Sequence, residues 1–306
     1  MDVDSAISVR DLKKSYGQTK AVDGVSFSVA RGEVFGLLGP NGAGKTTTVE
    51  CIEGLRRPDA GEITILGWRQ GPDSGKIKEI IGLQLQSTGL FPKLTVRETI
   101  GMFGTLFPRA LPTEHLIELV GLGEKARTAA GSLSGGQRQR LTVALALVND
   151  PEIVFLDEPT TGLDPQARRA LWDVVRDLRH RGKTVVLTTH YMEEAEELCD
   201  RVAVVDKGRI IELGSPAALV SKHFRESAIE LAASAAPPLE ELARLSGVSR
   251  VLTEDGHVTL YTSDVPATMA GLLSATTEGS GLRDLNVRRA SLEDVFLKIT
   301  GRRIRS

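Results

Sequence analysis

An apolar stretch that runs directly into a glycine-rich turn constrains this chain most: residues 34–48 read VFGLLGPNGAGKTTT. The turn has the form GxxxxGK[ST], with Gly39, Gly44, Lys45 and Thr46 at its fixed positions. Glycines let backbone N–H groups wrap phosphates, the lysine reaches the β- and γ-phosphates, and the threonine hydroxyl can ligate Mg²⁺. A helix that begins behind the turn would point its positive end at the anion. The pattern therefore predicts an α/β fold of the P-loop class.

Short runs of β-branched and apolar residues alternate with helical patterns up to about residue 220. The later runs are continuously apolar, which is typical of parallel strands covered on both faces. Residues 165–179 carry apolar side chains at the i, i+3, i+4, i+7 spacing of an amphipathic helix. The predicted strands are Ile7–Val9, Val25–Val29, Val34–Leu38, Glu62–Leu66, Ile153–Leu156, Val185–Thr188 and Val202–Val205. We expect one domain over residues 1–222 with a parallel core sheet.

Two segments break this alternation. Residues 95–148 read as mostly helical, which predicts a helical subdomain inserted between strands. Near the C-terminus, an alanine- and proline-rich loop is followed by two strand-like runs around the turn EDG, a helix over 265–274 and a strand near 284–288. Ser291 and the acidic residue three positions later resemble a capping box ahead of a last helix. These patterns predict a separate small α+β domain over residues 223–306.

The composition argues against several classes of protein. The chain has 306 residues, 41% of them hydrophobic and 25% charged, which is ordinary for a globular protein. A net charge of −2 gives no basic field, so we expect no nucleic-acid partner. The longest apolar runs, such as LTVALALV at 141–148, are far shorter than the roughly 20 residues that span a bilayer. We expect no membrane crossing, and the two cysteines suggest neither a disulfide framework nor a metal site.

A second apolar run, IVFLDEP at 153–159, ends in two adjacent carboxylates. Successive side chains of a strand point in opposite directions, so Asp157 and Glu158 would diverge. That divergence suits two roles: Asp157 would orient a Mg²⁺ ion, and Glu158 would polarise the water that attacks a γ-phosphate. Such a pair alone more often starts a helix or a loop, but together with a P-loop it predicts nucleotide hydrolysis.

With these motifs the chain resembles the ATP-binding subunits of ATP-binding-cassette transporters over about residues 5–220. The signature turn of that family, LSGGQ, stands at 133–137, its D-loop at 162–165 as GLDP, and its switch histidine is His190 in LTTH. The family also has an aromatic residue some 25–30 positions before the P-loop lysine, and Tyr16 fits. The resemblance implies a parallel core sheet, an antiparallel β subdomain and the inserted helical subdomain, with ATP and Mg²⁺ as cofactors.

The resemblance also implies a head-to-tail dimer and roles for single residues. Each ATP would lie between the P-loop of one copy and the LSGGQ turn of a second copy of the chain. Tyr16 would stack on adenine, His190 would contact the γ-phosphate and hold Glu158 in place, and Asp164 would link the two sites. The residues implied to bind ATP are Tyr16, Gly39, Pro40, Asn41, Gly42, Ala43, Gly44, Lys45, Thr46, Thr47, Ser134, Gly135, Gly136, Gln137 and Asp164. Those implied in catalysis are Lys45, Gln86, Glu158 and His190, and those implied to hold Mg²⁺ are Thr46, Gln86 and Asp157.

The glutamine that the family places after the P-loop is ambiguous in this chain. The stretch IGLQLQ contains Gln84 and Gln86, two positions apart on one face of a strand, so periodicity cannot choose between them. The family commonly has a tyrosine and a proline shortly before this glutamine, and this stretch has neither. Alignment on the preceding IG favours Gln86.

The resemblance implies an ATPase motor at the cytoplasmic face of a membrane, peripheral and docked on separate transmembrane permease subunits. The tail RRASLEDVFLKITG, within residues 284–301, is similar to that of drug-resistance exporter ATPases of the daunorubicin/doxorubicin type and of related lipid or polysaccharide exporters. That second resemblance implies export of a hydrophobic substrate, a drug or a lipid.

A soluble cassette ATPase switch that acts on ribosomes or DNA is the alternative function. Such proteins typically carry two cassettes in one chain or a long coiled-coil insertion. This chain has a single P-loop and no sustained heptad pattern. A membrane-protein reading frame beside the gene would favour the exporter.

Overall fold

The computed structural model describes residues 5–85, 89–254, 256–275 and 285–300. The chain divides into two compact units, one up to Pro216 and one from Ala217 onward. The boundary that the sequence predicts, after residue 222, lies a few residues further along and stays a prediction.

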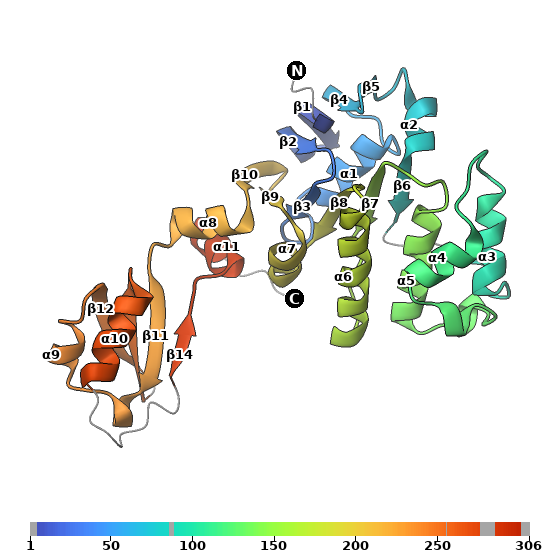
Figure 1. The fold of residues 1–306 in the computed structure, drawn as a ribbon. Helices are drawn as coiled ribbons and strands as arrows, with labels where there is room; N and C mark the ends of the chain where they lie inside the picture. The colour runs from blue at the N-terminus through green and yellow to red at the C-terminus, as the bar shows by residue number, and fades with distance from the viewer. Residues whose placement is uncertain (1–4, 86–88, 255, 276–284, 301–306) are drawn as a thin grey trace. The chain divides into compact units, whose positions relative to one another are not determined.

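A six-stranded sheet forms the centre of the first unit, in the order β10-β9-β3-β8-β7-β6 (Figure 1). Its strands are β3 (Val34–Leu38), β6 (Ile81–Gln84), β7 (Ile153–Asp157), β8 (Thr184–Thr189), β9 (Arg201–Asp206) and β10 (Arg209–Gly214). All neighbours pair in parallel except β10, which is antiparallel to β9. Every residue of β3, β7 and β8 is buried, as the continuous apolar runs predict for strands covered on both faces.

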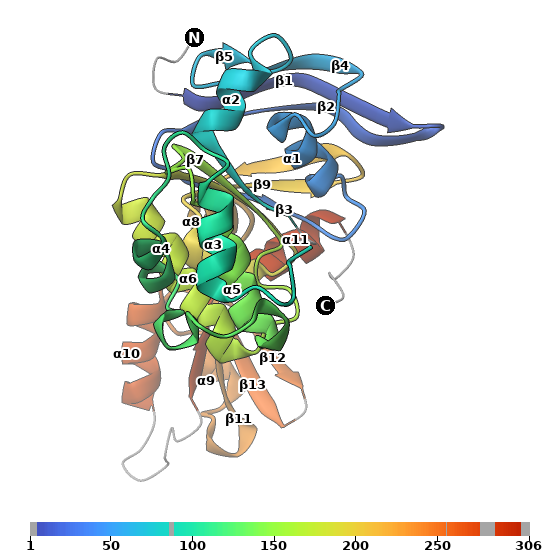
Figure 2. The same ribbon diagram turned by 90° about the vertical axis from the view of Figure 1, so that its right-hand side faces the viewer.

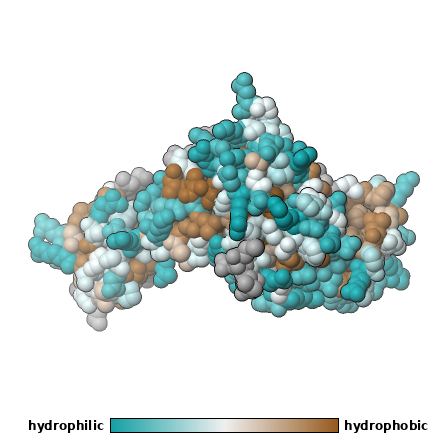
Figure 3. Space-filling model, turned by 90° about the horizontal axis from the view of Figure 1, so that it is seen from above, coloured by the Kyte–Doolittle hydropathy of each residue, from teal (hydrophilic) through white to brown (hydrophobic). Residues whose placement is uncertain are grey.

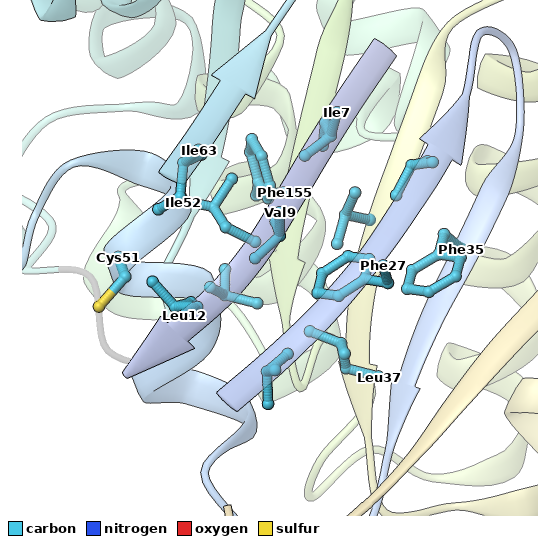
Figure 4. Close-up of a cluster of buried hydrophobic side chains, with 14 of the residues drawn as sticks. Ile7, Val9, Leu12, Phe27, Phe35, Leu37, Cys51, Ile52, Ile63 and Phe155 are labelled. Atoms are coloured by element: carbon cyan, nitrogen blue, oxygen red, sulfur yellow. The ribbon is translucent and has the colours of Figure 1, made fainter. Parts of the chain in front are cut away.

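A second, antiparallel sheet has the order β2-β1-β4-β5. Its strands are β1 (Ser5–Tyr16), β2 (Thr19–Ala30), β4 (Ala60–Ile65) and β5 (Trp68–Arg69). Helix α1 (Lys45–Glu53) contacts β1 and β2 of this sheet and β7 of the central sheet, and Figure 2 shows it below β1, β2 and β4. Figure 4 shows the apolar cluster between the sheets, where Phe27 stacks on Phe35 with ring centroids 5.1 Å apart. All seven predicted strands coincide with or overlap observed ones.

The segment predicted to be helical contains three helices of the first unit: α3 (Val96–Gly104), α4 (Thr113–Leu119) and α5 (Gly135–Ala146). The short turns η1 (Gly123–Lys125) and η2 (Ala130–Ser132) separate α4 from α5. The remaining helices of the first unit are α2 (Ser74–Ile80), α6 (Pro165–His180) and α7 (Met192–Leu198). Among the residues described, no helix has the length and apolar character that crossing a bilayer would require.

The second unit is a small α+β structure with a four-stranded antiparallel sheet in the order β12-β13-β11-β14. After α8 (Pro216–His223), its elements are β11 (Ser227–Ala232), η3 (Ala233–Ala235), α9 (Leu239–Leu242), β12 (Val248–Glu254), β13 (His257–Thr262), α10 (Val265–Ala275), β14 (Asn286–Arg288) and α11 (Leu292–Thr300). Leu242 and Leu272 from α9 and α10 join its buried core. The predicted hairpin, helix and final strand are all present, and Ser291 and Asp294 exchange hydrogen bonds at the start of α11.

Candidate functional site

The glycine-rich turn after β3 is shaped by two other segments of the backbone. Gly44 has a φ of +102°, and a Cβ atom there would lie 2.2 Å from the carbonyl oxygen of Ala21. A Cβ atom on Gly39 would lie 2.2 Å from the carbonyl oxygen of Val205. Both contacts are far shorter than van der Waals distance, so glycine is required at both positions. These close contacts fix the backbone of the turn where it enters α1. A phosphate site at a helix N-terminus requires a backbone fixed in this way.

The P-loop residues differ in their exposure, and the tip of the turn is the exposed part. Asn41 and Gly42 are exposed, Pro40 is half-buried, and Ala43 is buried. Thr47, in the first turn of α1, is half-buried.

Lys45 turns back over the loop that precedes it. Its Nζ donates to the carbonyl oxygens of Gly39 at 2.8 Å and Pro40 at 3.1 Å, and it lies 3.4 Å from Oε1 of Glu158. The side chain is 4% exposed. Burial lowers the pKa of Lys45, although Glu158 and Asp157 oppose that shift. The ammonium group of Lys45 is thus held between the carbonyl oxygens of the turn and the carboxylate of Glu158.

Asp157 ends β7 beside the first turn of α1. Its Oδ1 accepts a hydrogen bond from Thr46 Oγ1 at 3.3 Å and another from the hydroxyl of Thr188 on β8. Burial raises the pKa of Asp157, and the hydrogen bond from Thr188 is the largest opposing effect. The hydroxyl oxygen of Thr46 and the carboxylate of Asp157 lie 3.3 Å apart. Both are oxygen ligands of the kind that Mg²⁺ prefers, so this pair fits a Mg²⁺ ion.

Glu158, the next residue, lies beyond the end of β7, between Lys45 and His190. Its Oε2 lies 3.3 Å from Nδ1 of His190 and accepts a hydrogen bond from Thr161 Oγ1 at 3.2 Å. The backbone of Glu158 has a φ of +46°, in the left-handed region that a glutamate rarely adopts. Glu158 is 8% exposed and His190 is 9% exposed. A carboxylate between a cation and an imidazole can accept a proton from water bound at the same place.

The signature turn is built differently, because its hydrogen bonds are local. Ser134 caps α5: its hydroxyl accepts from Gln137 N at 3.3 Å, and Gln137 Oε1 accepts from Ser134 N at 3.1 Å. Ser134 and Gly135 are exposed, whereas Gly136 and Gln137 are half-buried. A Cβ atom on Gly135 would meet no atom within 4 Å, whereas one on Gly136 would lie 2.6 Å from Cβ of Ala167. The turn thus leaves Ser134 and Gly135 exposed, with open space where Gly135 lacks a side chain.

Tyr16 stands at the end of β1 and is 44% exposed. The Lys14 ammonium lies 5.8 Å and the Arg56 guanidinium 5.5 Å from the centre of its ring. Asp59 fixes this end of the strand by accepting hydrogen bonds from Lys14 Nζ at 2.8 Å and from a backbone amide. The accessible ring surface is compatible with stacking on a flat base.

The remaining predicted site residues are Asp164 and the two glutamines after the P-loop. Asp164 is exposed and caps α6, where its Oδ1 accepts from Ala167 N at 2.8 Å. Gln84, on β6, is 1% exposed, and its Nε2 donates to the carbonyl oxygen of Leu85. Gln86 lies outside the described residues, so its choice over Gln84 stays a prediction.

The structure thus brings Lys45, Thr46, Asp157, Glu158 and His190 together from three separate segments of sequence. It also places Thr188 among them, a residue that the sequence analysis did not single out. The only signal for Thr188 was its position in LTTH, two residues before the histidine, and a threonine is unremarkable in a buried strand.

Two family models match the chain. The model described as "ABC transporter" matches residues 22–161, and the model described as "ATP-binding protein DrrA1-3-like, C-terminal domain" matches residues 219–300. Similar curated proteins match over nearly the whole length. "Nod factor export ATP-binding protein I" of Rhizobium sp. (strain N33) is 44% identical over 304 residues, covering 97% of each chain. The protein of the same name from Ralstonia nicotianae (strain ATCC BAA-1114 / GMI1000) is 42% identical over 307 residues, covering 98% of this chain and 95% of that one.

Solved structures resemble the first unit. The ATP-binding cassette MJ0796, described as a dimer in a post-hydrolysis state bound to ADP and Pi, is 27% identical with a TM-score of 0.62, covering 68% of this chain and 98% of that one. The protein cbiO1 from Clostridium perfringens, part of the ABC transporter complex cbiONQ, is 29% identical with a TM-score of 0.63, covering 69% of this chain and 89% of that one.

Proposed function

Because this chain belongs to the ATP-binding subunits of ABC transporters and is an ATPase, we propose that it is the motor of a membrane exporter. The observation that carries the proposal is the buried cluster in which Glu158 lies 3.4 Å from Lys45 Nζ and 3.3 Å from His190 Nδ1. The same chain also contains the signature turn, with Ser134 and Gly135 exposed, and a C-terminal unit that matches the DrrA-like model.

In the proposed reaction, Glu158 polarises the water that attacks the γ-phosphate of ATP. Lys45 stabilises negative charge on the phosphates, and His190 holds the Glu158 carboxylate and the γ-phosphate in one arrangement. Thr46 and Asp157 would hold Mg²⁺, which would supply positive charge beside the phosphates. Tyr16 stacks on the adenine, and the P-loop amides surround the β- and γ-phosphates.

We place the second half of each site on a second copy of the chain. Ser134 and Gly135 are exposed, and a Cβ atom on Gly135 would meet no atom within 4 Å, which suits contact with the nucleotide of a partner. The solved cassette described as a dimer bound to ADP and Pi supports a dimer of this chain. Neither half-site is complete alone, so hydrolysis would require closure of the dimer.

We expect separate transmembrane subunits to bind the first unit beside α3, at the cytoplasmic face of the membrane. Phe91 and Leu106, on either side of that helix, are 55% and 69% exposed. Apolar side chains also gather in Figure 3 at the right-hand end, where Figure 1 draws α3. Large apolar side chains exposed in this way favour an interaction site.

The direction of transport and the class of substrate rest on the relatives. The relatives from Rhizobium and Ralstonia are named for Nod factor export, and the C-terminal unit matches the DrrA-like model. We therefore propose export of a hydrophobic, drug- or lipid-like molecule.

Reconstitution tests this proposal. The membrane protein encoded beside the gene would be placed in vesicles with the purified chain outside, and ATP-dependent uptake of a fluorescent amphiphile would be measured. Uptake should require ATP and disappear with Lys45→Ala. ATPase activity stimulated by ribosomes or DNA, with no response to the membrane protein, would overturn the exporter in favour of a soluble switch.

A further inference from the structure

We propose that Thr188 is a positioning residue for hydrolysis, which uses one hydroxyl group to fix both the side chain of Asp157 and the backbone of Glu158. Thr188 lies on β8, the strand that leads to His190, and is 0% exposed. It touches neither nucleotide nor metal in this role, because both of its contacts are with other protein groups. The inference rests on the proposed Mg²⁺-dependent hydrolysis.

The hydroxyl of Thr188 makes two hydrogen bonds of opposite sense. It donates to Oδ1 of Asp157 and accepts from the backbone N–H of Glu158 at 2.9 Å. The same N–H also lies 3.2 Å from the carbonyl oxygen of Thr188. A hydroxyl can donate one hydrogen bond and accept others, so a single group satisfies a buried carboxylate and a buried amide together.

The link to Asp157 matters because its other hydroxyl partner is itself a predicted Mg²⁺ ligand. Thr46 Oγ1 also donates to Oδ1 of Asp157, at the longer distance of 3.3 Å. Thr46 would have to serve the ion and Asp157 together, whereas both hydrogen bonds of the Thr188 hydroxyl are to protein groups. Groups behind a metal ligand typically orient it in this way, and their loss costs roughly 10–100-fold in metal affinity or activity.

The link to Glu158 matters because that residue has an unfavourable backbone conformation. Glu158 has a φ of +46°, and this backbone conformation persists only if the surrounding residues hold it in place. The two acceptors on Thr188 fix its N–H at the point where the chain leaves the sheet. They therefore set the direction in which the carboxylate of Glu158 points, toward Lys45 and His190.

The same strand supplies a matched control. Thr184, at the opposite end of β8, is also buried, and its Oγ1 accepts from the backbone N–H of Gly32 at 3.0 Å. Thr184→Val and Thr188→Val each remove one hydroxyl group from β8. Both replacements are β-branched and suit a strand, so their general effect on packing is comparable. Of these two threonines, only Thr188 contacts the predicted metal ligand Asp157 and the predicted catalytic residue Glu158.

The test compares Thr188→Val, Thr188→Ser and Thr184→Val by binding of a fluorescent ATP analogue over a Mg²⁺ titration, and by kcat and KM. Thr188→Val should raise the Mg²⁺ concentration for half-maximal response about 10-fold and lower kcat about 10–100-fold. Nucleotide binding in EDTA should not change. Thr188→Ser keeps the hydroxyl and should recover kcat to within about 3-fold, and Thr184→Val should match the wild type in both readouts.

Equal Mg²⁺ responses and equal kcat values for Thr188→Val and Thr184→Val would overturn the inference. Failure of Thr188→Ser to recover activity, with a melting temperature like that of the wild type, would overturn it as well. Failure of the proposed function would appear in the wild type itself, as nucleotide binding and hydrolysis that do not respond to Mg²⁺.

Discussion

The P-loop and the signature turn are both glycine-rich entries to a helix, but the chain surrounds them differently. At the P-loop, a Cβ atom on Gly44 would collide with the backbone of Ala21, and Lys45 is 4% exposed. At the signature turn, Ser134 is exposed and a Cβ atom on Gly135 would meet no atom within 4 Å. One glycine is therefore required by this chain, whereas nothing in the described residues requires the other. The requirement at Gly135 would come from outside the chain, as a head-to-tail partner would supply it.

Gly136 lies between these two cases. A Cβ atom there would lie 2.6 Å from Cβ of Ala167 in the first turn of α6. That helix is capped by Asp164, the D-loop residue. The second glycine of the signature turn is thus required by packing within the chain, and only its neighbour faces outward without restriction.

The largest expected effect comes from breaking each half-site separately. Ser134→Arg and Lys45→Ala should each abolish ATPase activity, because each homodimer loses one element of both sites. An equimolar mixture should regain activity, since the intact Lys45 of one variant can pair with the intact Ser134 of the other. The measurement is steady-state phosphate release by each variant and by the mixture. A mixture with neither activity nor ATP-dependent association between the two variants would contradict a site shared between chains.

The next largest effect concerns Glu158, the glutamate that lies between Lys45 and His190. Glu158→Gln keeps the shape of the side chain but removes the base, so hydrolysis should slow about 10²-fold or more while ATP binding persists. The variant should accumulate as an ATP-bound dimer, visible by size-exclusion chromatography with light scattering. Thr161→Val removes a hydrogen bond to the same carboxylate and should cost much less. Turnover by Glu158→Gln close to that of the wild type would exclude it as the base.

A pair of glycine substitutions tests the comparison directly. Gly44→Ala should destabilise the fold by about 1–3 kcal/mol or more, because the new methyl group meets backbone at a strained φ. Gly135→Ala should leave the melting temperature nearly unchanged or slightly raised, since alanine favours a helix. Its ATPase activity should nevertheless fall about 10-fold if the turn closes on a partner's nucleotide. Full activity in Gly135→Ala would show that this face stays open during turnover.

How much of this the sequence could predict depends on the range of the interactions involved. The continuous apolar strands and the P-loop carry their signal within a few adjacent residues, and the structure confirms them. Strands β10 and β11 were not predicted, because RIIELG and SAIELA lack long β-branched runs and become strands by pairing with β9 and β13. The hydrogen bonds of Thr188 to residues about thirty positions away depend on strand register, which no local pattern shows.

The last expected effect concerns Glu53, the last residue of the helix that follows the P-loop. Glu53 is 2% exposed, and its Oε1 has no hydrogen-bond partner within the described part of the chain. Burial raises the pKa of Glu53 to about 8, and the negative charges of Asp157 and Glu50 add to that shift. An unfolded glutamate titrates near pH 4.3, so between about pH 4.3 and pH 8 the folded chain holds a proton that the unfolded chain has released. The stability contributed by neutral Glu53 is complete below that window and is lost as the pH rises through it, by up to about 1.4 kcal/mol per pH unit.

Glu53→Gln removes this titration, so its melting temperature should fall less than that of the wild type between pH 5 and pH 8. The gap should widen by about 2–4 °C for each kcal/mol. Glu118→Gln is the matched control, because Glu118 is exposed on α4, in the helical segment that carries the signature turn. The melting temperature of Glu118→Gln should follow that of the wild type across this pH range. That result would assign the pH sensitivity of stability to the helix that follows the P-loop. Parallel profiles for Glu53→Gln and the wild type would show instead that Glu53 is ionised in the folded chain across this range, and that the P-loop helix tolerates a buried charge.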